Sequence, residues 1–138
     1  MRVHFKAMAS YGADNLAYQA SVANSVALIQ MLFDGFIESI NAAKGHLQHG
    51  AIQEKCKSIA RASRIVVGLQ GALDFQKGGD LAHNLDELYS YITRRLLQAN
   101  AQNDLQALEE IHGLMSEIRQ AWQDVPSLLP AQALSNFH

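Results

Sequence analysis

Cysteine and proline are scarce in this 138-residue sequence, and each scarcity narrows the possible folds. The single cysteine, Cys56, cannot form an internal disulfide, so a disulfide framework is excluded and a reducing compartment is indicated. We expect Cys56 to pack as a small apolar side chain. The two prolines, Pro126 and Pro130, lie near the end, and β-hairpin turn signals are absent. The length suits one domain with its own core, and most of the chain is free to be helical.

The sequence also lacks a strong excess of positive or negative charge. Its 11 lysines and arginines are nearly balanced by 13 aspartates and glutamates, giving a net charge of −2. No long basic run is present, so nucleic-acid binding is not expected. No apolar leader precedes Ala7-Met8-Ala9, so a secretory signal is not expected either. Residues 15–33 carry no charge, but the asparagines and glutamines among them disfavour membrane insertion. We expect a soluble, cytoplasmic protein.

Between about residues 24 and 125 the apolar pattern is helical, with three interruptions. Four helices of about 20–25 residues joined by short loops pack best as antiparallel neighbours, which predicts an all-α, up-and-down four-helix bundle. The expected helix ends are Gly50 after the first helix, Gly78–Gly79 with Asp80 capping the third helix, and Asn103 or Asp104 capping the fourth, while Asn24 or Ser25 caps the first.

The predicted helices differ in how much of their circumference is apolar. The third and fourth have one-sided faces of about 100° and 140°, whereas the first is apolar over about 180° and the second is also broad. The first helix therefore carries more apolar surface than one packed face requires. The main apolar stripes of the four helices are, in order, Leu28, Leu32, Phe36 and Ala43; Ile59, Val66, Leu69 and Leu73; Leu81, Leu85, Leu88, Tyr89, Ile92 and Leu96; and Leu105, Leu108, Ile111, Met115, Ile118 and Trp122. The first helix adds a second stripe, Val26, Phe33, Ile37 and Ile40, and the second helix is extended by Cys56, Ala60 and Val67.

Contiguous exposed apolar surface on a monomer marks an interaction site, and an amphipathic partner helix laid in a groove is the recurrent solution. A homodimer in which the extra surface pairs with itself is the structural alternative. The bundle, residues 24–125, is flanked by a weakly apolar arm, residues 1–23, expected to contain a short helix, and by a tail, residues 126–138, expected to be flexible.

An enzyme on the same scaffold is the alternative from a different class. Glu109-x-x-His112 and Asp80-x-x-His83 have the spacing of di-iron ligands, but Glu109 points about 120° from the apolar face, so the ligands do not converge. For phosphotransfer, the acidic residues around His83 would repel a phosphoryl group. No catalytic triad, phosphate loop or CxxC motif appears. We expect no enzymatic activity and no metal or other cofactor.

Two separate stretches resemble motifs of the FliS family, the flagellin export chaperones. Residues 77–104, KGGDLAHNLDELYSYITRRLLQANAQND, resemble the family's long motif, and residues 28–37, LIQMLFDGFI, resemble its first-helix motif. Trp122 stands where the family usually has "AW". The resemblance covers about residues 11–125. It implies an antiparallel helical bundle that binds the disordered C-terminal segment of flagellin in the cytosol, prevents premature polymerisation and delivers flagellin to the flagellar export gate, without nucleotide or metal.

The resemblance also implies client-binding positions. Tyr11 falls at the family's N-terminal tyrosine, which implies that the arm covers the client groove in the free protein. Phe33 serves equally well as a core residue, and Arg94 and Arg95 either neutralise acidic client residues or bond to neighbouring carboxylates. Tyr91 points about 120° from the core face and is the better client-facing tyrosine of the pair. The full set is Tyr11, Tyr18, Ile29, Phe33, Ile37, Tyr89, Tyr91, Arg94 and Arg95.

Overall fold

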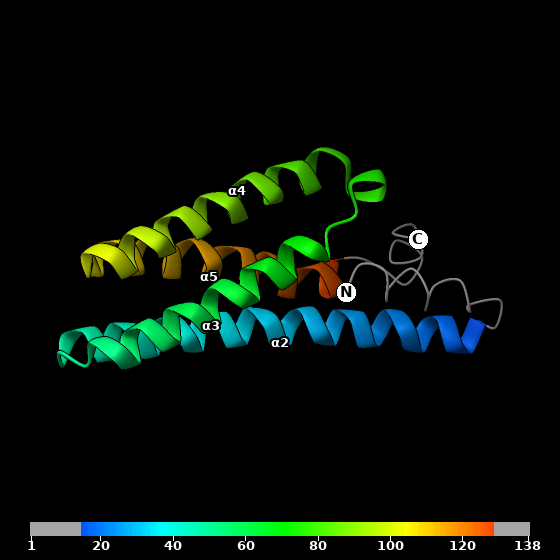
Figure 1. Ribbon diagram of the computed structural model, residues 1–138. Coiled ribbons are helices and arrows are strands. Elements are labelled where there is room, and N and C mark those ends of the chain that lie inside the picture. Colours follow the sequence, from blue (N-terminus) through cyan, green and yellow to red (C-terminus); the bar gives the residue numbers. More distant parts are fainter. Residues whose placement is uncertain (1–14, 129–138) are drawn as a thin grey trace.

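Figure 1 shows the computed structural model of the protein, which describes the backbone of residues 15–128 and the side chains of residues 25–124. The elements are α2 (Asn15–Gln48), α3 (Ile52–Gly71), α4 (Phe75–Gln102) and α5 (Leu105–Leu128). α2 packs against α3 and α5, and α4 packs against the same two helices. The α2–α3 and α4–α5 turns lie at one end of the bundle and the α3–α4 connection lies at the other (Figure 1). The predicted all-α, antiparallel four-helix bundle is confirmed.

The turn between α2 and α3 is the one that the sequence predicts. Gly50 adopts a left-handed conformation, with φ of 72°. The Ala51 N–H donates to the carbonyl of His46 (2.8 Å), and the Gly50 N–H donates to that of Leu47 (3.2 Å). These two bonds form a Schellman motif, in which glycine avoids the steric cost of a positive φ.

The turn between α4 and α5 combines two polar residues. Asn103 ends α4 in a left-handed conformation, with φ of 52°, which asparagine tolerates better than most residues. Asp104 then caps α5, because its carboxylate accepts a hydrogen bond from the Ala107 N–H at 3.1 Å. The predicted break and its cap are confirmed.

A buried lysine ties α3 to this turn. Lys55 is 1% exposed, and its Nζ donates to the carbonyl of Asn100 (2.8 Å) and to Oδ1 of Asn103 (2.6 Å). The side chain of Lys55 thus crosses from one helix to the C-terminal carbonyls of another, which a basic group at a helix end stabilises. The amino group fixes the position of the α4 end relative to α3.

The break predicted at Gly78–Gly79 is present, but one more helical turn precedes it. α3 ends at Gly71, and α4 begins at Phe75 because Asp74 accepts hydrogen bonds from two backbone N–H groups of the next turn, at 3.0 and 3.1 Å. Gly79 then interrupts the helix with a non-helical φ of 50° and ψ of −129°, so α4 changes direction after its first turn (Figure 1). The residue that caps the start of α4 is Asp74 rather than the expected Asp80.

The first helix is longer than predicted. α2 starts at Asn15, so the expected caps at Asn24 and Ser25 lie within it. Neither glycine nor proline occurs between Asn15 and Asp34, and asparagine and serine can be accommodated inside a helix when nothing breaks it. The N-terminal part of α2, which contains Tyr18, extends beyond the other helices (Figure 1).

The core is built from all four helices, and most predicted faces are correct. Phe33 and Ile40, expected on the additional apolar stripe of the first helix, are fully packed rather than surplus. The prediction for Leu81 is wrong in the opposite sense, because this residue was placed on the core face of α4 but its side chain is 64% exposed. The buried cluster comprises Phe33, Phe36, Ile40, Ala43, Ile59, Ala62, Val66, Leu69, Tyr89, Ile92, Leu96, Ala99, Ala107, Leu108, Ile111 and Met115.

One stretch among the described helices, Ser25–Gln48 of α2, is long and apolar enough to cross a membrane by length and composition alone. Core helices of soluble proteins share these properties. Phe33, Phe36, Ile40 and Ala43 in this stretch are buried in the core cluster, so packing within the bundle accounts for the most apolar face of α2.

We predict that Lys55→Met destabilises the protein by about 1–3 kcal/mol, because the substitution leaves two buried acceptors at the α4 end without their donor. Lys57→Met is the matched control. The Lys57 side chain is 74% exposed and pairs only with Glu54, so its loss is expected to change stability by less than about 0.5 kcal/mol. Urea unfolding followed by circular dichroism measures both, and equal midpoints would contradict the role assigned to Lys55.

We predict opposite effects of alanine at two glycines. Gly79→Ala forces a side chain into a conformation that favours glycine and is expected to cost about 1–3 kcal/mol. Gly113→Ala, within α5 where an added Cβ meets nothing within 4 Å, is expected to stabilise by about 0.5–1 kcal/mol. Thermal unfolding of the two variants tests whether the kink is required, and a neutral Gly79→Ala would show that it is not.

Candidate functional site

An apolar pocket opens between the helices at the end of the bundle that carries the α3–α4 connection. Its volume is about 270 Å³. All four helices and the connection contribute walls, since α2 supplies Ile29 and Phe33 while α5 supplies Ile118 and Trp122. The remaining lining residues are Leu69, Ala72, Leu73, Leu81, Leu85, Tyr89 and Ala121.

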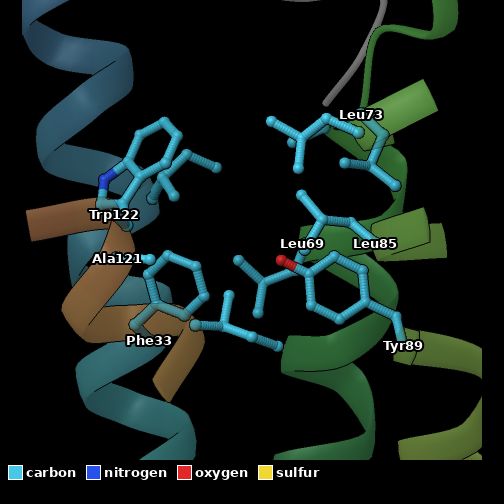
Figure 2. Close-up of a pocket in the computed structure, with 11 residues that line it drawn as sticks. Phe33, Leu69, Leu73, Leu85, Tyr89, Ala121 and Trp122 are labelled. Carbon is cyan, nitrogen blue, oxygen red and sulfur yellow. The ribbon is translucent and has the colours of Figure 1, made fainter. Parts of the chain in front are cut away.

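The pocket has two facing walls, as Figure 2 shows. Phe33, Ala121 and Trp122 form one wall, and Leu69, Leu73, Leu85 and Tyr89 form the other. The rings of Phe33 and Trp122 lie 6.2 Å apart at an angle of 53°, a tilted arrangement that aromatic pairs favour. The walls separate because α4 diverges from α2 and α5 toward its kinked end (Figure 1), which leaves Leu81 exposed at the edge of the pocket.

Two polar groups belong to residues that line the pocket. Tyr89 is 2% exposed, and the removal of water by burial raises the pKa of its phenol to about 12. Its hydroxyl points from α4 toward the wall that holds Phe33 (Figure 2). The indole Nε1 of Trp122 is buried without an acceptor among the described residues, and in Figure 2 it points away from Tyr89.

A second cluster lies on the outer surface between α4 and α5. The carboxylate of Glu110 accepts hydrogen bonds from the Tyr91 hydroxyl (2.9 and 3.0 Å) and from Nε of Arg95 (2.7 Å). The pKa of Glu110 is lowered, first by the hydrogen bond from Arg95 and then by that from Tyr91. The hydrogen bond between Tyr91 and Glu110 raises the pKa of the Tyr91 phenol. The guanidinium of Arg94 lies 5.9 Å from the centre of the Tyr91 ring. Arg95 therefore satisfies the predicted alternative of bonding to a neighbouring carboxylate.

Ile37 lies at a third place, in a shallow hollow on the α2–α5 side. It is half-buried and surrounded by polar side chains, among which Asp34 accepts from Nε of Arg119 at 2.8 Å. Glu38 pairs across to Arg61 of α3 at 3.6 Å. This hollow is polar except for Ile37 itself.

The predicted site residues thus fall into three groups rather than one. Ile29, Phe33 and Tyr89 meet in the apolar pocket, and Phe33 and Tyr89 are also core residues. Tyr91, Arg94 and Arg95 lie together on the α4–α5 surface, and Ile37 lies in the hollow. Tyr11 lies outside the described residues, as does the side chain of Tyr18.

The sequence prediction missed most of the pocket walls. Leu69, Leu73, Leu85 and Trp122 were expected in the core, because an apolar period identifies a face without showing where two faces separate. The exposure of Leu81 could have been anticipated, because this residue closely follows the paired glycines Gly78 and Gly79, at which a helix can change direction. Ala72 and Ala121 are too small to stand out in any apolar pattern.

The described residues contain no cluster of side chains suited to metal-dependent catalysis. Within residues 15–128, no group of three or more His, Cys, Asp and Glu side chains could hold a metal ion. The imidazole of His83 instead stacks on Phe75, with ring centres 4.7 Å apart. The arrangement is that of a helical bundle with an apolar pocket.

Comparison with known proteins agrees with this class. The sequence matches the family described as "Flagellar protein FliS" over residues 7–128. It is 46% identical over 99 residues to the flagellar secretion chaperone FliS of Salmonella typhimurium, covering 71% of this chain and 73% of that protein. It is 40% identical over 120 residues to the flagellar secretion chaperone FliSB of Pseudomonas aeruginosa (87% and 95%) and 38% identical over 128 residues to FliS of Escherichia coli (90% and 92%).

These matches, together with the helical bundle, place this chain among the helical secretion chaperones, a non-enzymatic class. Within that class, the chain belongs to the FliS family.

We predict that Arg95→Gln raises the pKa of Glu110 more than Tyr91→Phe does, because the hydrogen bond from Arg95 is the larger cause of the depression. Since the pKa is lowered in the folded protein, the interaction is present above that pKa and is lost as the pH falls through it. Carboxyl chemical shifts of Glu110 in an NMR titration measure the change. An unaltered titration in Arg95→Gln would show that the ion pair does not persist in solution.

Proposed function

We propose that this protein is a cytoplasmic export chaperone that binds the C-terminal segment of flagellin in the apolar pocket, prevents its premature polymerisation and presents it to the flagellar export gate. The observation that carries the proposal is the pocket of about 270 Å³ between α2, α3, α4 and α5, whose walls are almost entirely apolar. Membership of a family of flagellar secretion chaperones supports the identity of the client.

The size of the pocket favours side chains of a partner helix over a cofactor. An engineered cavity of about 150 Å³ holds one benzene molecule. A volume of about 270 Å³ therefore has room for one or two large apolar side chains. Residues at i and i+3 or i+4 of an amphipathic helix present such side chains side by side.

The pocket alone is too small to hold a disordered client tightly. Two buried apolar anchors contribute about 3–6 kcal/mol, whereas micromolar binding needs about 8 kcal/mol and ordering the client costs about 2–5 kcal/mol more. A client that folds on binding must therefore contact further surfaces of the chaperone. A long client segment wrapped around the bundle would supply these additional contacts.

The other predicted positions are suitable further contacts. The aromatic ring of Tyr91 and the guanidinium of Arg94 beside it offer an apolar contact next to a positive charge. This pair suits a stretch of client that contains both apolar and acidic residues. Arg95 is engaged by Glu110, so Arg94 is the cation of the pair better placed to meet a client carboxylate. Ile37 offers a single apolar contact on the α2–α5 side.

Residues 1–23 complete the proposal as a displaceable cover. Residues 1–14 of the arm, which include Tyr11, precede α2, whereas residues 15–23, which include Tyr18, belong to its first turns. Ile29 of the same helix lies in the pocket wall. We expect the arm to occupy the client groove in the free protein and to leave it when flagellin binds.

The test is a charged substitution at the edge of the pocket. We predict that Leu81→Asp weakens binding of a flagellin C-terminal peptide at least about 10-fold, because a carboxylate would have to be desolvated against apolar walls. Leu97→Asp is the matched control, since both leucines lie on α4 and are similarly exposed (64% and 65%), but Leu97 is outside the pocket. Isothermal titration calorimetry gives both affinities.

Equal affinities of the two variants would contradict the placement of the client in this pocket. Circular dichroism and thermal unfolding should be unchanged in both, because each leucine is exposed in the free protein. If the protein is instead a dimer that pairs its own apolar surface, sedimentation over a dilution series will show dissociation, and Leu81→Asp will shift it.

A further inference from the structure

The hydroxyl of Tyr89 is the exception in an otherwise apolar pocket wall. Tyr89 is 2% exposed, and its hydroxyl forms no hydrogen bond with any described residue. Burial alone accounts for its raised pKa, with no hydrogen-bonding contribution from a neighbour. The fully buried side-chain atoms without a partner among the described residues are Asn100 Oδ1 and Trp122 Nε1, and the Tyr89 hydroxyl is not one of them. Its oxygen is therefore still within reach of solvent, although the residue as a whole is buried.

The direction of the hydroxyl relates it to the client. It points from α4 toward the wall that holds Phe33 and therefore into the volume that a client side chain would fill (Figure 2). Whenever neither the arm nor a client fills the pocket, solvent entering it can hydrate the hydroxyl. A purely apolar client side chain would strip this hydration without replacing it, and an unpaired buried hydroxyl is unfavourable.

We propose that Tyr89 is a specificity-determining residue, whose hydroxyl hydrogen-bonds to an oxygen atom that the flagellin segment places in the pocket among its apolar side chains. The inference rests on the proposed function and adds a requirement to it. Apolar anchors provide the affinity, and one polar group of the client, set beside them, selects the register in which the segment binds. Segments of equal hydrophobicity without that group would bind less tightly, because the hydroxyl would be left unpaired.

The test compares the full-length protein with its Tyr89→Phe variant, using a synthetic peptide of the flagellin C-terminal segment as the probe. Calorimetry is expected to give binding about 5- to 100-fold weaker for the variant, because a buried acceptor on the client loses its donor. Thermal unfolding of the free variant is expected to be unchanged or shifted upward, since the hydroxyl has no protein partner to lose. A structural role for the hydroxyl would lower the unfolding temperature instead.

A peptide series locates the client oxygen. Each serine, threonine, asparagine and glutamine is replaced in turn by an apolar residue of similar size, and every peptide is titrated against both proteins. A side-chain partner is identified by one replacement that weakens binding to the wild type and has no further effect on Tyr89→Phe. If Tyr89→Phe weakens binding but no replacement does, the partner is a backbone carbonyl of the client, and the inference still holds.

Two outcomes would overturn the inference, and they differ from failure of the proposed function. Equal or tighter binding of the peptide by Tyr89→Phe shows that no hydrogen bond forms there, while the wild type still binds its client. A lowered unfolding temperature with proportionate loss of binding shows a structural role. If the wild type itself does not bind the peptide, the proposed function fails and the inference fails with it.

Discussion

The buried amino group of Lys55 fixes the end of the bundle at which α4 turns into α5. A lysine withdrawn from water needs hydrogen-bond acceptors, and here they come from the α4 end, the carbonyl of Asn100 and the side chain of Asn103. Because Asn103 also makes the left-handed turn into α5, a single side chain of α3 sets the positions of two other helices. With the Schellman turn at Gly50 beside it, this end is closed.

The opposite end, which carries the α3–α4 connection, contains the pocket. α4 is tied to the rest of the bundle at its C-terminal end, but its first turn is set by Asp74 and then redirected at Gly79. α4 therefore diverges from α2 and α5 toward this end but stays beside α3, to which it is bonded because Gln70 Nε2 donates to Asp86 and Ser90. The apolar side chains of α3 and α4 then face those of α2 and α5 across the pocket. The amount of apolar surface is not what exposes it, since Phe33 and Ile40 of the wide α2 face are buried. Helix direction decides which apolar residues remain available to a partner.

This distinction explains what the sequence could predict. Periodicity identified the core faces of α4 and α5, and local chemistry identified the turns at Gly50 and at Asn103–Asp104, because these features depend only on neighbouring residues. The start of α2 and the cap at Asp74 were missed, since asparagine, serine and aspartate are each compatible with several positions in or beside a helix. The pocket was not predictable from any one helix. Leu81 and Leu85 share one apolar face of α4, yet Leu81 is exposed and Leu85 is half-buried, because they lie at different distances along a diverging axis.

The same geometry bears on how tightly the proposed client could be held. A pocket with room for one or two anchors cannot by itself give tight binding, so affinity must be spread over several weak contacts. The α4–α5 surface fits this arrangement, because Glu110 already satisfies Tyr91 and Arg95 within the protein and leaves only modest interactions for a partner. Contacts of this kind can be given up one after another, whereas a single deep site would have to open at once. If the protein binds flagellin as proposed, a bundle tied together at Lys55 and open at its other end holds these contact surfaces in fixed positions relative to one another.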